Sequence, residues 1–338
     1  MTRTTTATTM AEPTLPTSIG FIGLGLMGSP MAANLARKLP PGSHIHVHDV
    51  VPSAITSLQT AFPDVIVPCS SAKEVTVRSE LIITMLPEGR HVRTVYLDPD
   101  TGILAGLLAS SDGGAAAKTV IDSSTIDTAT SLAVKEQLAE KSPGTTFYDA
   151  PVSGGVLGAE KGTIAFFLGA GSSDPNLPLL QPLLKLMGSQ AIPCGGPSLG
   201  LAAKLSNNYL SGIITIATAE AMDMGMRAGI DADVLASVFA AGTAQNAICD
   251  RFNPVPRVCP DAPSSKGYKG GFRVGLMRKD VGLAVDMARR VGSRNVLGAM
   301  GLGVYAAADA AEDCAGLDSR VVFRYIGGNE SWEKKDGA

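Results

Sequence analysis

One lysine in the second half of the chain has the neighbours that acid/base chemistry needs. Lys204 lies in an apolar stretch, with Gly200 four residues before it and Asn208 four residues after it. This spacing places the three residues on one face of a helix. Because burial lowers the pKa of an ammonium group, such a lysine can exchange a proton near neutral pH. The same spacing also fits a lysine that extends its charged end into solvent from a helix end.

Two further groups could bind or orient a small anionic substrate. Ser153, Gly154 and Gly155 follow a predicted strand, and their backbone N–H groups could form a nest for a carboxylate. An ordinary glycine turn is the alternative interpretation. Asp280 falls on the apolar face of a predicted helix, where a buried carboxylate needs a partner. Its more exposed neighbour Lys279 is either a solvated charge or a group that reaches a nearby site.

A glycine-rich turn near the N-terminus indicates a dinucleotide site. Gly23, Gly25 and Gly28 match the spacing G-x-G-x-x-G directly after the apolar residues 19–22, and a helical pattern follows from Met31. The first glycine allows a tight turn, and the second lets the backbone approach a pyrophosphate. The third lets helix and strand pack closely, while the helix N-terminus attracts the anion. On its own, such a turn also occurs in other α/β proteins.

Asp49 supports the dinucleotide interpretation and indicates which dinucleotide is preferred. It ends the second predicted strand, residues 44–48, and stands 21 residues after Gly28. In the dinucleotide fingerprint an acidic residue about 20 residues on bonds a ribose hydroxyl. No Arg or Lys lies between Asp49 and Lys73, so the local sequence offers no cation for a 2′-phosphate. We therefore expect NAD to be preferred over NADP.

Short apolar runs alternate with helical patterns through the first half of the chain. This alternation predicts an α/β fold of Rossmann type, a doubly wound parallel sheet with right-handed crossovers. Further strands are expected at residues 81–85, 119–121, 146–148 and 164–168. After the strand at 119–121, Ser124 or Thr125 can cap the next helix, which begins near Asp127, and either could also reach a cofactor hydroxyl.

The alternation stops near residue 195, and one long helix over 199–228 is followed by further helices to 325. We expect an all-helical C-terminal domain that the long helix joins to the sheet domain. The proline- and glycine-rich residues 253–271 cannot form a regular helix and predict a long loop, a common place for function. The expected segments are a disordered leader at 1–18, a dinucleotide-binding domain at 19–195, a helical substrate and oligomerisation domain at 196–326, and a flexible tail at 327–338.

Composition and charge exclude several classes of protein. The net charge is −3 without a long basic run, which argues against nucleic acid or an anionic membrane as the main partner. Five scattered cysteines without C-x-x-C are typical of reduced thiols, not of a disulfide framework or a zinc site. The uncharged residues 209–219 are too few to cross a bilayer, which needs about 20.

Three histidines alternate along the second predicted strand and therefore face one side of it. His44, His46 and His48 could be interpreted as metal ligands from this pattern alone. They lie inside a strand of a cofactor-binding fold, and no carboxylate cluster elsewhere supplies a conventional site. We therefore interpret them as structural and predict no metal.

Taken together, these motifs resemble the β-hydroxyacid dehydrogenase family from about residue 19 to 325. The shared features are Gly-Phe-Ile-Gly-Leu-Gly-Leu-Met-Gly-Ser-Pro-Met at 20–31, Asp-Ala-Pro-Val-Ser-Gly-Gly at 149–155, the Lys204–Asn208 helix, and Lys279-Asp280. Residues 83–87, 121–127, 218–222 and the loop from 253 to 280 are most similar to family members that oxidise 3-hydroxyisobutyrate.

The resemblance implies a role for each matching residue. Lys204 is the implied acid/base, Asn208 orients the substrate, and Ser153, Gly154 and Gly155 hold its carboxylate. The implied cofactor-binding residues are Gly23, Gly25, Leu26, Met27, Gly28, Asp49, Leu86, Pro87, His91, Thr125 and Lys279. The chain departs from the pattern at His91, where close relatives tend to carry Asn, and after Leu317.

The implied function is the NAD-dependent oxidation of 3-hydroxyisobutyrate to methylmalonate semialdehyde, a step of valine breakdown. A semialdehyde reductase acting on tartronate, succinic or glyoxylic semialdehyde is the alternative within the family; Asp49 and the proline-rich loop disfavour it. A non-catalytic NAD-binding module is the alternative of another class, and Lys204 and Asn208 disfavour it. The family also implies a homodimer or homotetramer, and a mitochondrial location in eukaryotes with a cytoplasmic one as the alternative.

Overall fold

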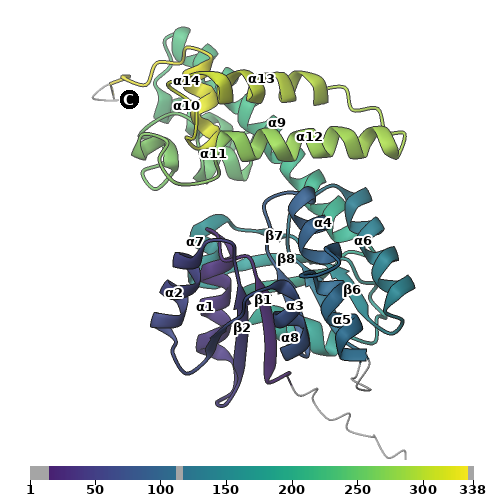
Figure 1. The fold of residues 1–338 in the computed structure, drawn as a ribbon. Helices are drawn as coiled ribbons and strands as arrows, with labels where there is room; N and C mark the ends of the chain where they lie inside the picture. The colour runs from purple at the N-terminus through teal and green to yellow at the C-terminus, as the bar shows by residue number, and fades with distance from the viewer. Residues whose placement is uncertain (1–14, 112–116, 334–338) are drawn as a thin grey trace, which may run out of the picture. The chain divides into compact units, whose positions relative to one another are not determined.

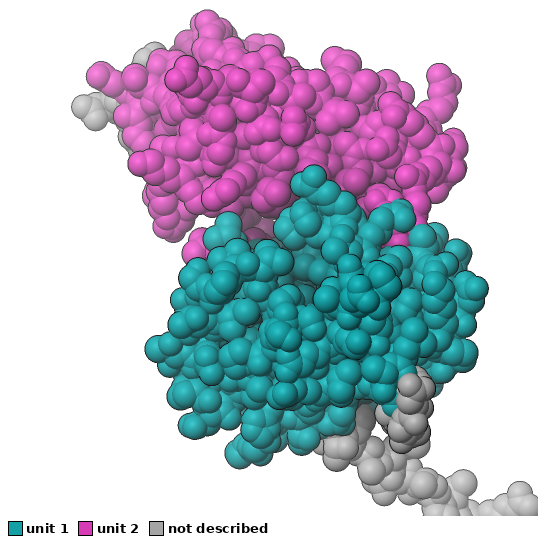
Figure 2. Space-filling view, in the orientation of Figure 1, with its two compact units in different colours: residues 1–124, 132–154, 158–200 teal, residues 125–131, 155–157, 201–338 magenta. Residues whose placement is uncertain are grey.

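The computed structural model describes residues 15–111 and 117–333, which form two compact units (Figure 2). Unit 1 contains the described residues up to 124, with 132–154 and 158–200. Unit 2 contains 125–131, 155–157 and the described residues from 201. Residues 1–14 of the expected leader and 334–338 of the expected tail lie outside the described residues.

Unit 1 is built on a six-stranded parallel sheet in the order β3-β2-β1-β4-β5-β6 (Figure 1). This order and the flanking helices confirm the predicted doubly wound fold of Rossmann type. The short β3, with a proline as its third residue, was not predicted from the sequence. The strands are β1 Ser18–Ile22, β2 His44–His48, β3 Ile66–Pro68, β4 Leu81–Thr84, β5 Thr119–Asp122 and β6 Thr146–Asp149.

Strands β1 and β4 in the middle of this sheet are mostly apolar because helices cover both faces. Ile19, Phe21 and Ile83 are completely buried, as are Met31 and Leu35 on the inner face of the first helix. The helices after the strands are α1 Gly28–Lys38, α2 Pro52–Ala61, α3 Ala72–Arg78, α4 Gly89–Leu97, α5 Ile103–Ser111, α6 Thr128–Lys141, α7 Gly155–Lys161 and α8 Leu177–Lys185.

A second, three-stranded sheet follows β6. It contains β7 Val152–Ser153, β8 Ile164–Leu168 and β9 Gly188–Pro193; β7 pairs antiparallel with β8, and β8 parallel with β9. The expectation that residues 164–168 extend the parallel sheet was therefore wrong. The connection from β7 to β8 is shorter than the dozen or so residues that a parallel crossover needs, so the strand returns antiparallel.

Unit 2 is helical, as predicted. The long helix α9 Leu199–Arg227 contains residues 209–219, and none of the helices in the described part of the chain is long and apolar enough to cross a membrane. Its other elements are α10 Ala232–Ala241, α11 Ala247–Arg251, η1 Pro263–Lys266, α12 Val274–Arg290, α13 Gly298–Ala310, η2 Ser319–Val321 and α14 Val322–Tyr325. Helices α12 and α13 run side by side (Figure 1).

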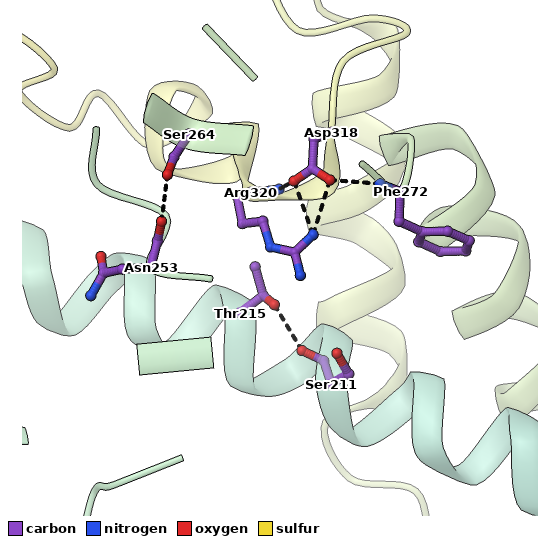
Figure 3. A network of polar contacts seen from close by, with 7 residues as sticks. All are labelled: Ser211, Thr215, Asn253, Ser264, Phe272, Asp318 and Arg320. Carbon is purple, nitrogen blue, oxygen red and sulfur yellow. Dashed lines mark hydrogen bonds and ion pairs between the residues drawn. The ribbon is translucent and has the colours of Figure 1, made fainter. Parts of the chain in front are cut away.

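The long loop before α12 is tightly held. Figure 3 shows its two ends: the backbone carbonyl of Asn253 accepts a hydrogen bond from Ser264 Oγ at 2.6 Å, and the carboxylate of Asp318 accepts one from Phe272 N at 2.7 Å. Arg320 pairs with the same carboxylate at 2.9 Å. Because Asp318 is completely buried, these donors are what stabilise its charge.

The segment after α14 differs from the expected flexible tail. Trp332 is 8% exposed, and its Nε1 donates a hydrogen bond to the backbone carbonyl of Pro256 at 2.8 Å. The Arg257 guanidinium lies 5.1 Å from the centre of the indole ring. The single tryptophan therefore packs on the loop instead of extending into solvent, because the loop offers an apolar surface and a carbonyl acceptor.

Candidate active site

The glycine turn after β1 leaves room for a phosphate. Gly23 has a φ of +94°, and a Cβ there would collide with the carbonyl oxygen of Met85. A Cβ on Gly28 would collide with the carbonyl oxygen of Gly23, so both positions require glycine. At Gly25 a Cβ would meet no described atom within 4 Å, which leaves the backbone open to a ligand. Helix α1 then begins at Gly28 without a side-chain cap on its first N–H groups, an arrangement that suits an anion.

Asp49 lies at the end of β2 beside this turn. Its Oδ2 accepts a hydrogen bond from Leu24 N at 2.6 Å, and its Oδ1 accepts one from Val51 N at 2.8 Å. These two bonds fix the direction of the carboxylate, and each oxygen keeps a second lone pair for a donor such as a ribose hydroxyl. This geometry fits the role that the fingerprint gives to the residue.

Leu86 lies against the same turn. Leu86 Cδ2 would stand 3.1 Å from a Cβ on Gly23, and Leu86 N donates a hydrogen bond to Ser124 Oγ at 2.8 Å. Ser124 Oγ thus binds the backbone N–H of Leu86 and does not cap the following helix. The cap comes from Asp127, whose Oδ1 accepts a hydrogen bond from Thr130 N. Pro87, which follows Leu86, is exposed.

Three of the remaining residues expected near the cofactor are less constrained. Leu26 is 64% exposed and Met27 is half-buried within the glycine turn. His91 lies on α4 and is half-buried, and its Nδ1 is a buried atom without a hydrogen-bond partner among the described residues. An unpaired ring nitrogen fits a ligand-facing position. The role of all three residues stays a prediction.

The proposed substrate nest has the backbone that such a site needs. Ser153 ends β7, and Gly154 and Gly155 follow with φ values of +135° and +65°. Two consecutive residues at positive φ turn their amide groups away from the regular pattern, and such turns form anion-binding concavities. A Cβ on Gly155 would meet no described atom within 4 Å. Its role in carboxylate binding stays a prediction.

Lys204 is buried on helix α9. Lys204 is only 7% exposed, and this burial lowers the pKa of its ammonium group to about 8. The carboxylate of Asp280 opposes this shift and raises the pKa, while the charge of Lys279 lowers it. The lysine does not extend into solvent, which removes the alternative interpretation of its spacing. A group with this pKa exists in both proton states near neutral pH, as acid/base catalysis requires.

Asn208 is one helical turn beyond Lys204 and bonds to α12. Its Nδ2 donates a hydrogen bond to Asp280 Oδ2 at 2.6 Å, and the Asp280 side chain is 2% exposed. Asp280 Oδ1 lies 3.3 Å from Lys279 Nζ, which also donates a hydrogen bond to the Thr125 carbonyl at 2.8 Å. Unit 2 therefore groups the charges of Lys204, Lys279 and Asp280 with the Asn208 amide and the Thr125 carbonyl. The sequence predicted that Asp280 needs a partner but did not identify Asn208 as that partner.

Asp122, at the end of β5, was not singled out from the sequence. It is 1% exposed, and burial raises the pKa of its carboxyl group to about 6. Its Oδ1 accepts hydrogen bonds from Thr84 Oγ1 at 2.8 Å and from Ser124 N at 3.1 Å. An acidic residue as the last position of an apolar strand was the signal that could have identified it.

The histidines of β2 do not form a metal centre. His44 is exposed and His46 is half-buried, and burial is the largest cause that lowers the pKa of His46. His48 Nδ1 lies 3.1 Å from the carbonyl oxygen of Cys69. Within residues 15–111 and 117–333, no group of three or more His, Cys, Asp or Glu side chains is arranged to hold a metal ion.

Comparison with known proteins defines the class of this chain. Residues 18–196 match the NAD-binding domain model of 6-phosphogluconate dehydrogenase, and residues 199–326 match the model of the NAD-binding domain of NADP-dependent 3-hydroxyisobutyrate dehydrogenase. The human mitochondrial 3-hydroxyisobutyrate dehydrogenase is 37% identical over 94% of this chain and 88% of its own length. An NAD-dependent L-serine dehydrogenase of Pseudomonas aeruginosa is 38% identical over 85% of this chain and 90% of its own.

A solved structure extends the comparison to the whole fold. The 3-hydroxyisobutyrate dehydrogenase of Mycobacterium tuberculosis, solved with L-serine, has a TM-score of 0.81 and 34% identity over 91% of this chain and 98% of its own. The chain therefore belongs to the β-hydroxyacid dehydrogenase family. It is an oxidoreductase that acts on the CH–OH group of a small hydroxyacid, and its cofactor is a nicotinamide dinucleotide, NAD(P).

Proposed function

We propose that the enzyme oxidises 3-hydroxyisobutyrate to methylmalonate semialdehyde with NAD. The observation that carries the proposed chemistry is the buried Lys204, whose pKa is lowered to about 8, and the substrate is proposed from the human relative. At this pKa the neutral amine can accept the proton of the substrate hydroxyl, and the ammonium can return a proton in the reverse direction. When bound, the nicotinamide ring accepts the hydride that leaves the carbinol carbon.

The other residues bind and orient. The turn at Ser153, Gly154 and Gly155 offers backbone N–H groups to the substrate carboxylate. Asn208 holds the substrate hydroxyl for Lys204, and its own amide is fixed by the bond to Asp280. The amide therefore cannot rotate freely, and its oxygen keeps one direction. Fixed polar groups in a buried site lower the cost of reaching the transition state.

The preference for NAD over NADP is proposed from Asp49. Its carboxylate is directed by Leu24 N and Val51 N and would meet a 2′-phosphate with a like charge. A ribose hydroxyl would instead donate a hydrogen bond to it. The relative from Pseudomonas aeruginosa that is NAD-dependent also supports this choice.

L-Serine is the second candidate substrate. It carries the same carboxylate and a hydroxyl on the third carbon, and two relatives point to it, one by its activity and one by the molecule bound to it. Reduction of tartronate, succinic or glyoxylic semialdehyde is the third candidate, because a dehydrogenase with the same site also runs in reverse. The three candidates share the roles proposed for Lys204 and the glycine turn.

A substrate panel tests the proposal. Initial rates of NAD and NADP reduction are measured with 3-hydroxyisobutyrate, L-serine and other short 3-hydroxyacids, and NADH oxidation with the three semialdehydes. We expect the highest kcat/KM for 3-hydroxyisobutyrate with NAD. A higher kcat/KM for L-serine would replace the proposed substrate, and a higher value for a semialdehyde would make the enzyme a reductase.

We also propose a homo-oligomer, at least a dimer. Leu297 and Met300, at the start of α13, are 47% and 71% exposed, and a subunit contact is a natural cover for such side chains. Light scattering after gel filtration tests this, and a monomeric mass at micromolar concentration would reject it. A mitochondrial location is proposed from the human relative and is tested by fractionation of the source cells; recovery in the cytosol would reject it.

A further inference from the structure

A series of hydrogen bonds in unit 1 joins Tyr96 on α4 to strands β4 and β5 and ends at the backbone of Leu86. Tyr96 OH and Thr84 Oγ1 are 2.9 Å apart, and Thr84 Oγ1 donates to Asp122 Oδ1 at 2.8 Å. Asp122 Oδ1 also accepts a hydrogen bond from the backbone N of Ser124 at 3.1 Å. Ser124 Oγ in turn accepts from Leu86 N at 2.8 Å.

The directions of these bonds follow from the donors available. Leu86 N can only donate, so Ser124 Oγ is the acceptor of the bond between them. Thr84 gives its proton to Asp122 Oδ1 and therefore accepts that of Tyr96. Asp122 Oδ1 is therefore the common acceptor for Thr84 Oγ1 and for the backbone N of Ser124. The second of these bonds fixes the segment that carries the Ser124 hydroxyl group.

Burying the carboxyl group of Asp122 costs free energy, so we expect this group to have a specific role. Asp122 is 1% exposed at the end of β5, and Ser124 and Thr84 are completely buried. A buried carboxyl group destabilises a fold unless its bonds compensate for the lost water. An apolar residue would fill the same space without that cost. The group orients the loop after β4, which an apolar residue cannot do.

We infer that Asp122 is a positioning residue for the cofactor: acting through Ser124, it fixes the backbone at Leu86 against the glycine turn. Leu86 lies beside Gly23, the first glycine of that turn, where a Cβ on Gly23 would stand 3.1 Å from Leu86 Cδ2. A shift of Leu86 therefore moves one wall of the dinucleotide site. The inference rests on the proposed role of Leu86 and Pro87 in binding the cofactor, and it assigns no role to the substrate residues.

Two neighbouring serines provide a matched test. Ser123 and Ser124 are both completely buried, but Ser123 Oγ has no hydrogen-bond partner among the described residues, whereas Ser124 Oγ bonds Leu86 N. The dissociation constant of NADH is measured by fluorescence titration for Ser124→Ala and Ser123→Ala. We expect Ser124→Ala to weaken NADH binding about tenfold, the factor that corresponds to one hydrogen bond. Ser123→Ala should stay within about twofold of the wild type, since it loses no such bond.

Two substitutions test Asp122 itself, one that keeps a hydrogen-bond acceptor and one that removes it. Asp122→Asn keeps an oxygen for Thr84 and Ser124, while Asp122→Ala removes it. We expect Asp122→Ala to raise the KM for the dinucleotide and the NADH dissociation constant together, with the KM for the hydroxyacid nearly unchanged. Asp122→Asn should recover most of the loss. Should Asp122→Ala fail to fold, the serine pair still decides the inference.

The outcomes separate this inference from the proposed function. NADH titration needs no hydroxyacid, so a wrong substrate assignment leaves the readout intact. Equal NADH affinity in Ser124→Ala, Ser123→Ala and the wild type would overturn the inference. Equal increases in the KM of dinucleotide and hydroxyacid in the folded Asp122→Ala variant would also overturn it, because they indicate a general structural defect.

Discussion

Asn208 Nδ2 donates a hydrogen bond to Asp280 Oδ2 at 2.6 Å, which joins helix α9 to helix α12 inside unit 2. Both side chains are almost completely buried, so this hydrogen bond stabilises the charge of Asp280 in place of water. The same carboxylate raises the pKa of Lys204 against the effect of burial. One acidic residue thus fixes the direction of the Asn208 amide and raises the proton affinity of the Lys204 amine.

Asp280→Asn should move the pH dependence of oxidation to lower pH. Oxidation needs neutral Lys204, so its rate falls as the pH drops below the lysine pKa of about 8. Because the Asp280 charge raises that pKa, removing the charge lowers it and shifts the acidic limb of kcat/KM downward. Asp286→Asn, at an exposed position of the same helix, is the control. An unchanged or upward-shifted limb in Asp280→Asn would contradict the assignment.

Lys279→Met should move the same limb in the opposite direction. The positive charge of Lys279 lowers the pKa of Lys204, so its loss raises that pKa and shifts the acidic limb of kcat/KM upward. Lys279→Met also frees the carbonyl of Thr125 and should weaken cofactor binding. The exposed Lys269→Met controls for a change in net charge alone. A limb at the wild-type pH in Lys279→Met would show that Lys204 does not set the profile.

Asp49→Asn should reduce the discrimination between the two dinucleotides. Its side chain keeps an acceptor for the ribose but loses the charge that repels a 2′-phosphate. We expect the ratio of kcat/KM for NAD to that for NADP to fall about tenfold, the effect of roughly 1.4 kcal/mol. Steady-state kinetics with both dinucleotides measure the ratio, with the exposed Asp64→Asn as control. A wild-type enzyme that prefers NADP would reject the role of Asp49 directly.

Trp332→Ala should destabilise the fold. The substitution removes a buried indole, its hydrogen bond to Pro256 and its contact with Arg257, a loss of about 3 kcal/mol in the free energy of unfolding. Trp332→Phe keeps a ring in the same place and should lose only about 1 kcal/mol. Urea unfolding followed by circular dichroism measures both. A loss below about 0.5 kcal/mol for the alanine variant would show that the segment is not packed.

The fold was largely predictable because its signals are local. The glycine turn, Asp49 and the alternation of strands and helices appear within short windows of sequence. Strands β3, β7 and β9 were not predicted, because β3 ends in a proline, β7 has two residues, and β9 (Gly-Ser-Gln-Ala-Ile-Pro) contains no apolar run. The packing of Trp332 was missed for another reason: it depends on a loop far away in the chain, and the polar residues around the tryptophan indicate exposure.

The candidate site was predictable only in part. The spacing of Lys204 and Asn208 is visible in the sequence because one helix carries both residues. Their link to Asp280 is not visible, because the hydrogen bond joins residues 72 positions apart. Asp122 was missed since its partner Thr84 lies on the neighbouring strand, opposite it in the β4–β5 register. Such pairs follow from sheet register and helix packing, which a single sequence does not specify.

Hydride transfer by Lys204→Ala tests the account most directly. With NAD and 3-hydroxyisobutyrate at saturation, or with the hydroxyacid that the panel selects, we expect kcat to fall by about 10²- to 10⁴-fold, the usual contribution of an acid/base group. NADH should bind with nearly wild-type affinity, and Ser206→Ala, at an exposed position of the same helix, should turn over normally. Turnover by Lys204→Ala within a few-fold of the wild type, with the same pH profile, would contradict the proposed chemistry.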